Sequence, residues 1–236
     1  MRRREMLALM LAAGPPEAAV LLDVRTRRVL ALRNEVSARS ATAPGSIMKP
    51  LALTALLKSG KLRADEAFPC PGTLSIAGRQ LNCSHPRLAT PIDVETALAY
   101  SCNCFVARVA QRFAPGELPR APRVSGADAI RLQALGESGV AFTVVELADI
   151  YHELAMMAPA AVIAGLEGAV EYGTAQRAQV SGVKVAGKTG TVRGAAWFAG
   201  WMPSRAPEVV VVVRAPGRSG GADAAPAAAE LLRGRR

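Results

Sequence analysis

The stretch of sequence that decides the fold runs from residue 182 to residue 214 and reads GVKVAGKTGTVRGAAWFAGWMPSRAPEVVVVVR. It contains three apolar segments, 182–193, 195–202 and 208–214, which we interpret as three successive strands. The last segment includes the valine run from Val209 to Val213. Because an apolar run without alternation is typical of a strand covered on both faces, we expect helices on either side of the sheet.

Elements before and after this stretch complete the predicted fold. Two apolar runs, 19–24 and 28–33, predict a β-hairpin. The residues from Thr90 to Asp93 have the pattern of a capping box with Pro91 at the first helical position, which would begin a helix there. Helices are thus predicted over Ser46–Lys58, Thr90 to about Tyr100, Asn103–Phe113, Thr143–Met157 and Ala222–Leu232, with loops over 62–90 and 114–126. The prediction is an α/β sandwich, a five-stranded antiparallel sheet with helices on both faces.

Composition narrows the possible classes of protein. The chain has 236 residues, of which 50% are hydrophobic and 20% charged, a globular composition of a length usual for one domain. No apolar run reaches the roughly 20 residues of a spanning helix, which excludes a polytopic membrane protein. The net charge is +10, but the basic residues are scattered and no nucleic-acid motif is present, so we expect no nucleic-acid partner. A diffuse positive field instead favours anionic surfaces such as acidic lipid or a wall polymer.

The N-terminus has the pattern of a short export signal. Three arginines, Arg2 to Arg4, precede the apolar stretch Met6–Ala13, which ends in small residues and is too short to span a bilayer. We therefore expect residues 1–13 to be an export signal or a short N-terminal segment, and residues 14–236 to form a single compact domain. An ordinary first helix is the alternative. The expected location is exported, in the periplasm or cell envelope, with membrane association left open.

Two short motifs carry possible nucleophile chemistry. Ser46 and Lys49 are three positions apart at a helix start, so the hydroxyl and the amine share one helix face. Lys49 can act as the base for a Ser46 nucleophile if burial and a nearby cation lower its pKa. In Ser101-Cys102-Asn103, the Ser101 hydroxyl can relay a proton and the Asn103 amide can bind a substrate carbonyl.

A third motif, Lys188-Thr189-Gly190-Thr191, follows apolar residues on a predicted strand. A cation and two hydroxyls at a strand edge can bind a carboxylate. Gly190 would let a substrate backbone approach closely, and a substrate lying along that edge would pair like an added strand. Each motif alone is common in proteins without a catalytic role, so their order along the chain matters more than any one of them.

The order S-x-x-K, S-x-N, K-T-G is the signature of serine penicillin-recognising enzymes. From about Ala19 to Leu232, the chain resembles the transpeptidase domain of class B penicillin-binding proteins. Further similar segments are Pro44-Gly45 before the serine, Gly136–Gly139, Gly173-Thr174-Ala175 and Trp197-Phe198-Ala199-Gly200. The chain departs from the family pattern in lacking a large N-terminal pedestal domain, in a shortened stretch between Asn103 and Gly136, and in Thr143-Val144 where Thr-Pro is usual.

The resemblance implies a role for each motif residue. Ser46 would attack a D-Ala-D-Ala stem peptide of peptidoglycan, Lys49 would take its proton, and Ser101 would pass a proton to the leaving amine. Asn103 would hold the substrate amide, and Lys188, Thr189, Gly190 and Thr191 would bind the terminal carboxylate. The implied partners are stem peptides, β-lactams as inhibitors and cell-wall synthesis proteins, and the chemistry implies no cofactor.

Two other functions fit the same motifs. A β-lactamase needs a base that activates the deacylating water. Glu137 has a suitable place in the sequence, but the Leu-Asn that should follow is absent. The other alternative is a non-catalytic β-lactam sensor or wall-binding module, which would acylate without turnover of stem peptide.

The four cysteines are compatible with three structural roles. Cys70 and Cys83 bracket a Pro-Gly loop that a disulfide could close. Alternatively, Cys70, Cys83, His85 and either Cys102 or Cys104 could hold a structural zinc, since three thiolates and a histidine are an accepted ligand set. The third reading is that Cys102 and Cys104 are simply buried, so whether a metal is bound stays open. His152, in the middle of a predicted helix, is expected to be an ordinary surface or core residue.

Overall fold

The computed structural model describes residues 17–235. The predicted export signal, residues 1–13, lies outside the described residues. The sheet contains five strands in the order β2-β1-β7-β6-β5, each antiparallel to its neighbours. Their bounds are Ala18–Asp23 for β1, Val29–Arg33 for β2, Ala186–Val192 for β5, Ala195–Met202 for β6 and Val209–Pro216 for β7. The predicted five-stranded antiparallel sheet is confirmed.

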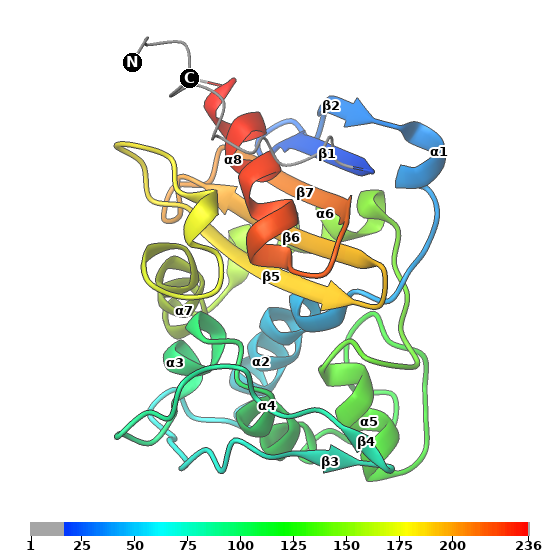
Figure 1. Ribbon diagram of the computed structural model, residues 1–236, viewed down its shortest axis with the longest axis vertical. Helices are drawn as coiled ribbons and strands as arrows, with labels where there is room; N and C mark the ends of the chain where they lie inside the picture. Colours follow the sequence, from blue (N-terminus) through cyan, green and yellow to red (C-terminus); the bar gives the residue numbers. More distant parts are fainter. Residues whose placement is uncertain (1–16, 236) are drawn as a thin grey trace, which may run out of the picture.

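Helices cover both faces of this sheet, as the valine run indicated. Val210 and Val212 pack into the larger apolar cluster with α2 and α6, whereas Val209, Val211 and Val213 pack on the other face against α8. Figure 1 shows α8 across the near face. The long helices are α2 (Lys49–Lys58), α4 (Asn103–Ala110), α5 (Ala127–Ala134), α6 (Val144–Met157), α7 (Ala160–Glu171) and α8 (Ala225–Arg233), and the shorter ones are α1 (Glu35–Ala38) and α3 (Val94–Ala99).

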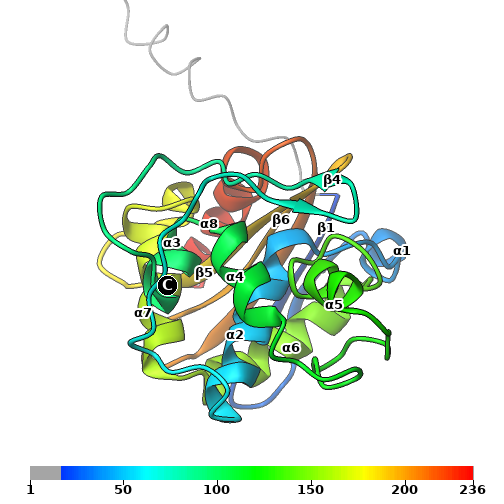
Figure 2. The same ribbon diagram turned by 90° about the horizontal axis from the view of Figure 1, so that it is seen from below.

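Helix α2 lies at the centre of the helical group next to the sheet. It contacts α3, α4, α6 and α7, and Figure 2 shows this group from below. The loop over residues 62–90 is as predicted, apart from the two-stranded pair β3 (Ser75–Ile76) and β4 (Arg79–Gln80). This arrangement places the start of α2, the start of α4 and the edge strand β5 close to one another.

Three side chains fix the segment that leads into α2. The Tyr151 hydroxyl donates to the Ile47 carbonyl oxygen at 2.9 Å, and the Trp197 indole donates to Ala43 O at 3.1 Å. Arg214, a buried residue of β7, donates to Ser40 O at 2.8 Å. Because these donors come from α6, β6 and β7, the position of Ser46 is set by both the sheet and a helix packed on it.

The structure corrects the predicted start of α3. Ile92 is in an extended bridge with Phe68, so the chain is not helical at Thr90 and Pro91. Asp93 is the N-cap instead, and its Oδ1 accepts from the Thr96 nitrogen at 2.8 Å. The strand predicted from residue 182 begins only at Ala186, and helices α5 and α7 were not predicted.

Two smaller findings concern the helices. His152 is a core residue, as one of the two expectations had it, and its Nε2 lies 2.9 Å from the Val24 carbonyl oxygen. Within residues 17–235, no single helix has the length and apolar composition of a membrane span. Helices α6 and α7 reach that length and composition only when they are counted as one segment, and the chain bends by 119° between them.

Candidate active site

The turn that carries Ser46 is a short 3₁₀ helix, Gly45–Met48, which continues into α2. Gly45 has φ +57°, a conformation that favours glycine, and its N–H donates to Gly136 O at 3.0 Å. A Cβ on Gly136 would lie 2.0 Å from the Gly45 carbonyl oxygen. A Cβ on Gly190 would lie 2.6 Å from Pro44 O. The glycines thus allow three backbone segments to meet at the turn that carries Ser46.

This packing gives Gly190 a different purpose from the predicted one. The sequence suggested that the missing side chain admits the substrate backbone. In the structure, the space beside its Cα is filled by the chain itself, by Pro44 and Ile47. Gly190 therefore brings β5 against the Ser46 turn.

Ser101 lies between α3 and α4 in a left-handed conformation, with φ +57°. It follows the α3 C-cap, Tyr100, at the position where helices often end in a left-handed glycine. The Cys102 N–H then donates to Ala97 O at 2.8 Å, which closes the helix end. A serine here costs about 1–2 kcal/mol of backbone strain. The conformation directs the Ser101 carbonyl toward Lys49.

Lys49 is fully buried and its Nζ has three partners. It donates to the Ser101 carbonyl oxygen at 2.7 Å, to Ser101 Oγ at 3.2 Å and to Asn103 Oδ1 at 2.5 Å. Burial lowers the pKa of Lys49 from 10.5 to about 8. A fraction of the amine is therefore unprotonated at neutral pH, as a general base must be.

Asn103 makes more hydrogen bonds within the protein than the sequence suggested. Besides accepting from Lys49, its Nδ2 donates to Leu81 O at 3.0 Å and to Asn82 O at 3.4 Å. Its amide therefore joins the 81–82 segment to the Lys49 amine. The expected role in holding a substrate amide would require these bonds to be exchanged.

Lys188 lies on β5 and is also fully buried. Its Nζ donates to Thr189 O at 3.1 Å. Burial, and next the charge of Lys49, lower the pKa of Lys188 well below its ordinary value. The neighbouring charge thus acts on Lys188, whereas the pKa of Lys49 is lowered by burial alone and not by the nearby cation expected from the sequence.

The hydroxyls of the third motif face a polar cleft. Thr189 Oγ1 donates to Thr174 Oγ1 at 2.9 Å, and Thr191 Oγ1 accepts from the Gly220 N–H at 3.0 Å. The cleft has a volume of about 360 Å³. It is lined by Ser46, Ser84, Ser101, Asn103, Glu137, Thr174, Thr189, Thr191, Ser219, Gly220 and Gly221. The structure thus brings all three predicted motifs together around one cleft.

The four cysteines gather beside this cleft as free thiols. Of the three alternatives left open by the sequence, the disulfide is not formed, since the Sγ atoms of Cys70 and Cys83 are 3.7 Å apart. The Sγ of Cys102, between Ser101 and Asn103 in the chain, lies 3.6 Å from that of Cys70. The thiols therefore connect the 70–85 loop to the second motif without a covalent bond.

The sequence was compared with models of known protein families, and one of these models matches most of the chain. The family model for the penicillin-binding protein transpeptidase domain matches residues 17–122 and 134–233. The chain belongs to this family. The matched residues include Ser46, Ser101 and Lys188, one residue from each motif.

Solved structures show the fold of this transpeptidase domain in another protein. The D,D-transpeptidase domain of a peptidoglycan glycosyltransferase from Eggerthella lenta superimposes with a TM-score of 0.78. The two sequences are 20% identical, and the match covers 94% of this chain and 78% of the other. At this identity the similarity shows a shared fold. A search of curated proteins found no match.

The structure adds cleft residues to this transpeptidase domain that the sequence analysis did not place in the site. Thr174 was noted only as part of a family-like segment, yet it bonds Thr189 directly. Ser84 and Ser219 reach the cleft from loops without a recognisable motif, and Gly220 reaches it from the start of a short π-helix, Gly220–Ala224. Glu137 also lines the cleft, where its Oε2 pairs with Arg79 at 3.0 Å.

Proposed function

We propose that the chain is a penicillin-binding serine D,D-transpeptidase that cross-links D-Ala-D-Ala stem peptides through an acyl-enzyme on Ser46. The observation that carries the proposal is the buried Lys49 amine with its lowered pKa, hydrogen-bonded to Ser101 one helical turn from Ser46. A nucleophile, a base and a relay hydroxyl in a polar cleft are the parts that acyl transfer requires.

Acylation follows from these positions. Neutral Lys49 accepts the Ser46 proton while Oγ attacks the carbonyl carbon of the penultimate D-Ala. The C–N bond then breaks, and Ser101 passes a proton to the departing D-Ala amine. An amine from a second stem attacks the ester next, forms the new amide and returns the proton that regenerates Ser46. A β-lactam would acylate Ser46 in the same way, except that its opened ring stays attached.

Substrate binding is assigned to the edge of the sheet. β5 is an outer strand, so its free edge can pair with an extended peptide. Thr189 and Thr191 offer hydroxyls to the terminal carboxylate, with Lys188 supplying positive potential from behind the strand. The N–H groups of Ser46 and Thr191 are the proposed oxyanion hole. In support, a Cβ on Gly45 would lie 3.2 Å from the Thr191 nitrogen, so the two backbones adjoin.

Acylation is expected to depend on pH through Lys49. With a pKa of about 8, Lys49 is the base only when unprotonated, so the rate should rise with pH and level off above that value. The second-order rate constant for acylation by a labelled penicillin, measured across this pH range, tests this. A flat profile across the same range contradicts Lys49 as the base.

The penicilloyl enzyme is expected to persist for many minutes. The sole carboxylate among the cleft-lining residues is that of Glu137, and its pairing with Arg79 directs it to the β4 hairpin. Intact-mass spectrometry over time should show a stable adduct, with the same lifetime in Glu137→Gln. Rapid loss of the adduct that slows in Glu137→Gln would instead indicate a β-lactamase.

The reaction itself can be tested with a D-Ala-D-Ala donor and an amine acceptor. We expect a cross-linked product, with the hydrolysed, shortened peptide as a side product. Stable penicillin binding without product from any stem peptide would favour the sensor or wall-binding alternative. Since stem peptides are extracytoplasmic, we also propose that the chain acts outside the cytoplasm, beside other cell-wall synthesis proteins. Fractionation of cells that express the tagged chain tests this location.

A further inference from the structure

Three thiols and one imidazole converge beside the catalytic cleft. The ligand atoms of Cys70, Cys83, His85 and Cys102 all lie within 4.8 Å of one another. The Sγ of Cys83 is 3.7 Å from the Sγ atoms of both Cys70 and Cys102. The Sγ atoms of Cys70 and Cys102 are 3.6 Å apart, and Cys70 Sγ is 3.6 Å from His85 Nε2.

These four distances are close to four of the six edges of a zinc tetrahedron, and the other two are no longer than 4.8 Å. Zn–S bonds of about 2.3 Å and Zn–N bonds of about 2.0 Å at tetrahedral angles separate two sulfurs by about 3.8 Å and a sulfur from a nitrogen by about 3.5 Å. The three sulfur pairs, at 3.6 to 3.7 Å, are close to the sulfur separation of such a site. We propose that Cys70, Cys83, His85 and Cys102 bind one zinc ion, with the three cysteines as thiolates.

The surroundings of the four side chains support this assignment. Each sulfur accepts one backbone N–H: Cys70 from Gly72 at 3.4 Å, Cys83 from Cys104 at 3.5 Å and Cys102 from Phe105 at 3.4 Å. Such donors stabilise thiolate charge, which otherwise has to be balanced by the metal alone. His85 Nδ1 lies 2.8 Å from Pro86 O, so Nδ1 carries the proton and Nε2 is free to bind metal.

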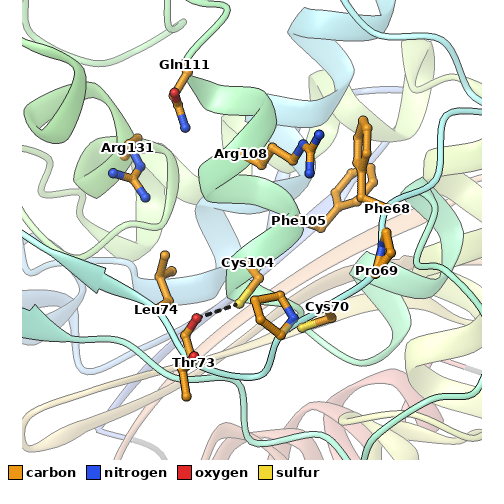
Figure 3. A pocket seen from close by; sticks show the side chains of 11 residues that line it. Phe68, Pro69, Cys70, Thr73, Leu74, Cys104, Phe105, Arg108, Gln111 and Arg131 are labelled. Atoms are coloured by element: carbon orange, nitrogen blue, oxygen red, sulfur yellow. Dashed lines mark hydrogen bonds between the residues drawn. The ribbon is translucent and has the colours of Figure 1, made fainter.

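Cys104 is close but outside the tetrahedron. Its Sγ is 3.5 Å from that of Cys83, and it donates to Thr73 O at 3.5 Å. Figure 3 shows Cys104 directed at Thr73 on the wall of a small neighbouring pocket, with Cys70 beside it. A thiol that donates to a carbonyl keeps its proton. Cys104 is therefore the matched control for the ligand cysteines.

The site has a consequence for the second motif. Cys102 separates Ser101 from Asn103, and both of these contact Lys49. The other three ligands belong to the 70–85 loop, whose Leu81 and Asn82 carbonyls bind Asn103. Zinc would thus fix the loop to the start of α4 and hold Ser101 in its left-handed conformation. This positioning role rests on the proposed function, whereas metal binding does not.

Metal content tests the site directly. We expect the full chain, purified without chelator, to contain one zinc ion. Replacing it with cobalt should give the sulfur-to-cobalt charge-transfer band and the visible bands of a tetrahedral site. Cys83→Ser should lose the metal and the spectrum, whereas Cys104→Ser should keep both. A wild-type chain without zinc and without the cobalt spectrum overturns the site, and so does Cys104→Ser losing the metal as completely as Cys83→Ser.

Two further readouts separate the positioning role from the proposed function. Removing zinc should speed tryptic cleavage at Arg79 and Arg87 in the loop and slow penicillin acylation, and both effects should reverse when zinc returns. Unchanged cleavage and acylation in the zinc-free chain overturn the positioning role. A chain that binds zinc but is not acylated at Ser46 retains the metal site and contradicts the proposed function. A chain that is acylated at Ser46 but takes up no zinc, even when zinc is supplied, retains the proposed function and overturns the metal site.

Discussion

Replacing Ser46 by alanine is expected to abolish covalent attachment of penicillin while leaving the fold intact. The loss should be complete because no ester can form without the Oγ atom. The fold should persist because the Ser46 hydroxyl makes no hydrogen bond among the described residues and the side chain is half-buried. Labelling followed by peptide mapping measures the first effect, and thermal unfolding measures the second.

A matched control is available in the same cleft. Ser84 also lines the cleft and is exposed, so Ser84→Ala should still be labelled, with the adduct mapped to Ser46. Attachment to Ser46→Ala at the wild-type level would exclude Ser46 as the nucleophile. If Ser84→Ala lost labelling to the same extent, the loss in Ser46→Ala would not be specific and would not identify Ser46 as the nucleophile.

Replacing Lys49 by alanine is expected to slow acylation by about 10²–10⁴-fold, the usual contribution of a positioned general base. The change also removes the amine that donates to Ser101 O and Asn103 Oδ1, two acceptors that are half-buried at the cleft. Stopped-flow acylation with a chromogenic cephalosporin provides the rate, and the surviving slow reaction should lose its dependence on a group with pKa near 8.

The control for this variant lies on the same helix. Lys58, in the last turn of α2, is exposed and far from the cleft-lining residues, so Lys58→Ala should acylate at the wild-type rate. An unaltered rate in Lys49→Ala would remove Lys49 as the base. A rate decrease of the same size in both variants would indicate general damage to α2.

The strands could be predicted from the sequence because their signal is local. The run Val209–Val213 requires cover on both faces whatever the rest of the chain does, and both faces are covered. The start of α3 could not be predicted from the sequence, because Thr90 and Pro91 are residues that favour the start of a helix locally. The bridge between Ile92 and Phe68 overrides that preference, and this contact joins distant parts of the chain.

Helix α7 was missed for a related reason. Gly165 and Gly168 lower its intrinsic helix propensity. In the fold, however, a Cβ on Gly165 would lie 2.8 Å from Glu95 O, so the glycine permits close packing against α3. Tertiary packing, which no local pattern encodes, makes this segment a helix.

Motif spacing predicted which residues meet in the cleft, but not how they are used. The order of the three motifs was enough to bring Ser46, Lys49 and Ser101 together. The hydrogen bonds from Asn103 Nδ2 to Leu81 and Asn82 could not be foreseen, because their acceptors are backbone carbonyls of a loop with no motif. The full burial of Lys188 behind β5 likewise depends on the packing of the completed sheet.

Under the proposed function, the glycine contacts at the turn that carries Ser46 also limit where drug resistance can arise. A side chain at Gly136 would meet backbone at 2.0 Å and one at Gly190 would meet it at 2.6 Å, so substitution there displaces the turn that carries Ser46. If Ser46 is the nucleophile, such a substitution would hinder its reaction with the substrate as well as with a β-lactam, so we expect no resistance from these two positions. Variants that discriminate drug from substrate are expected instead at exposed loop residues that line the cleft, such as Ser84 and Ser219.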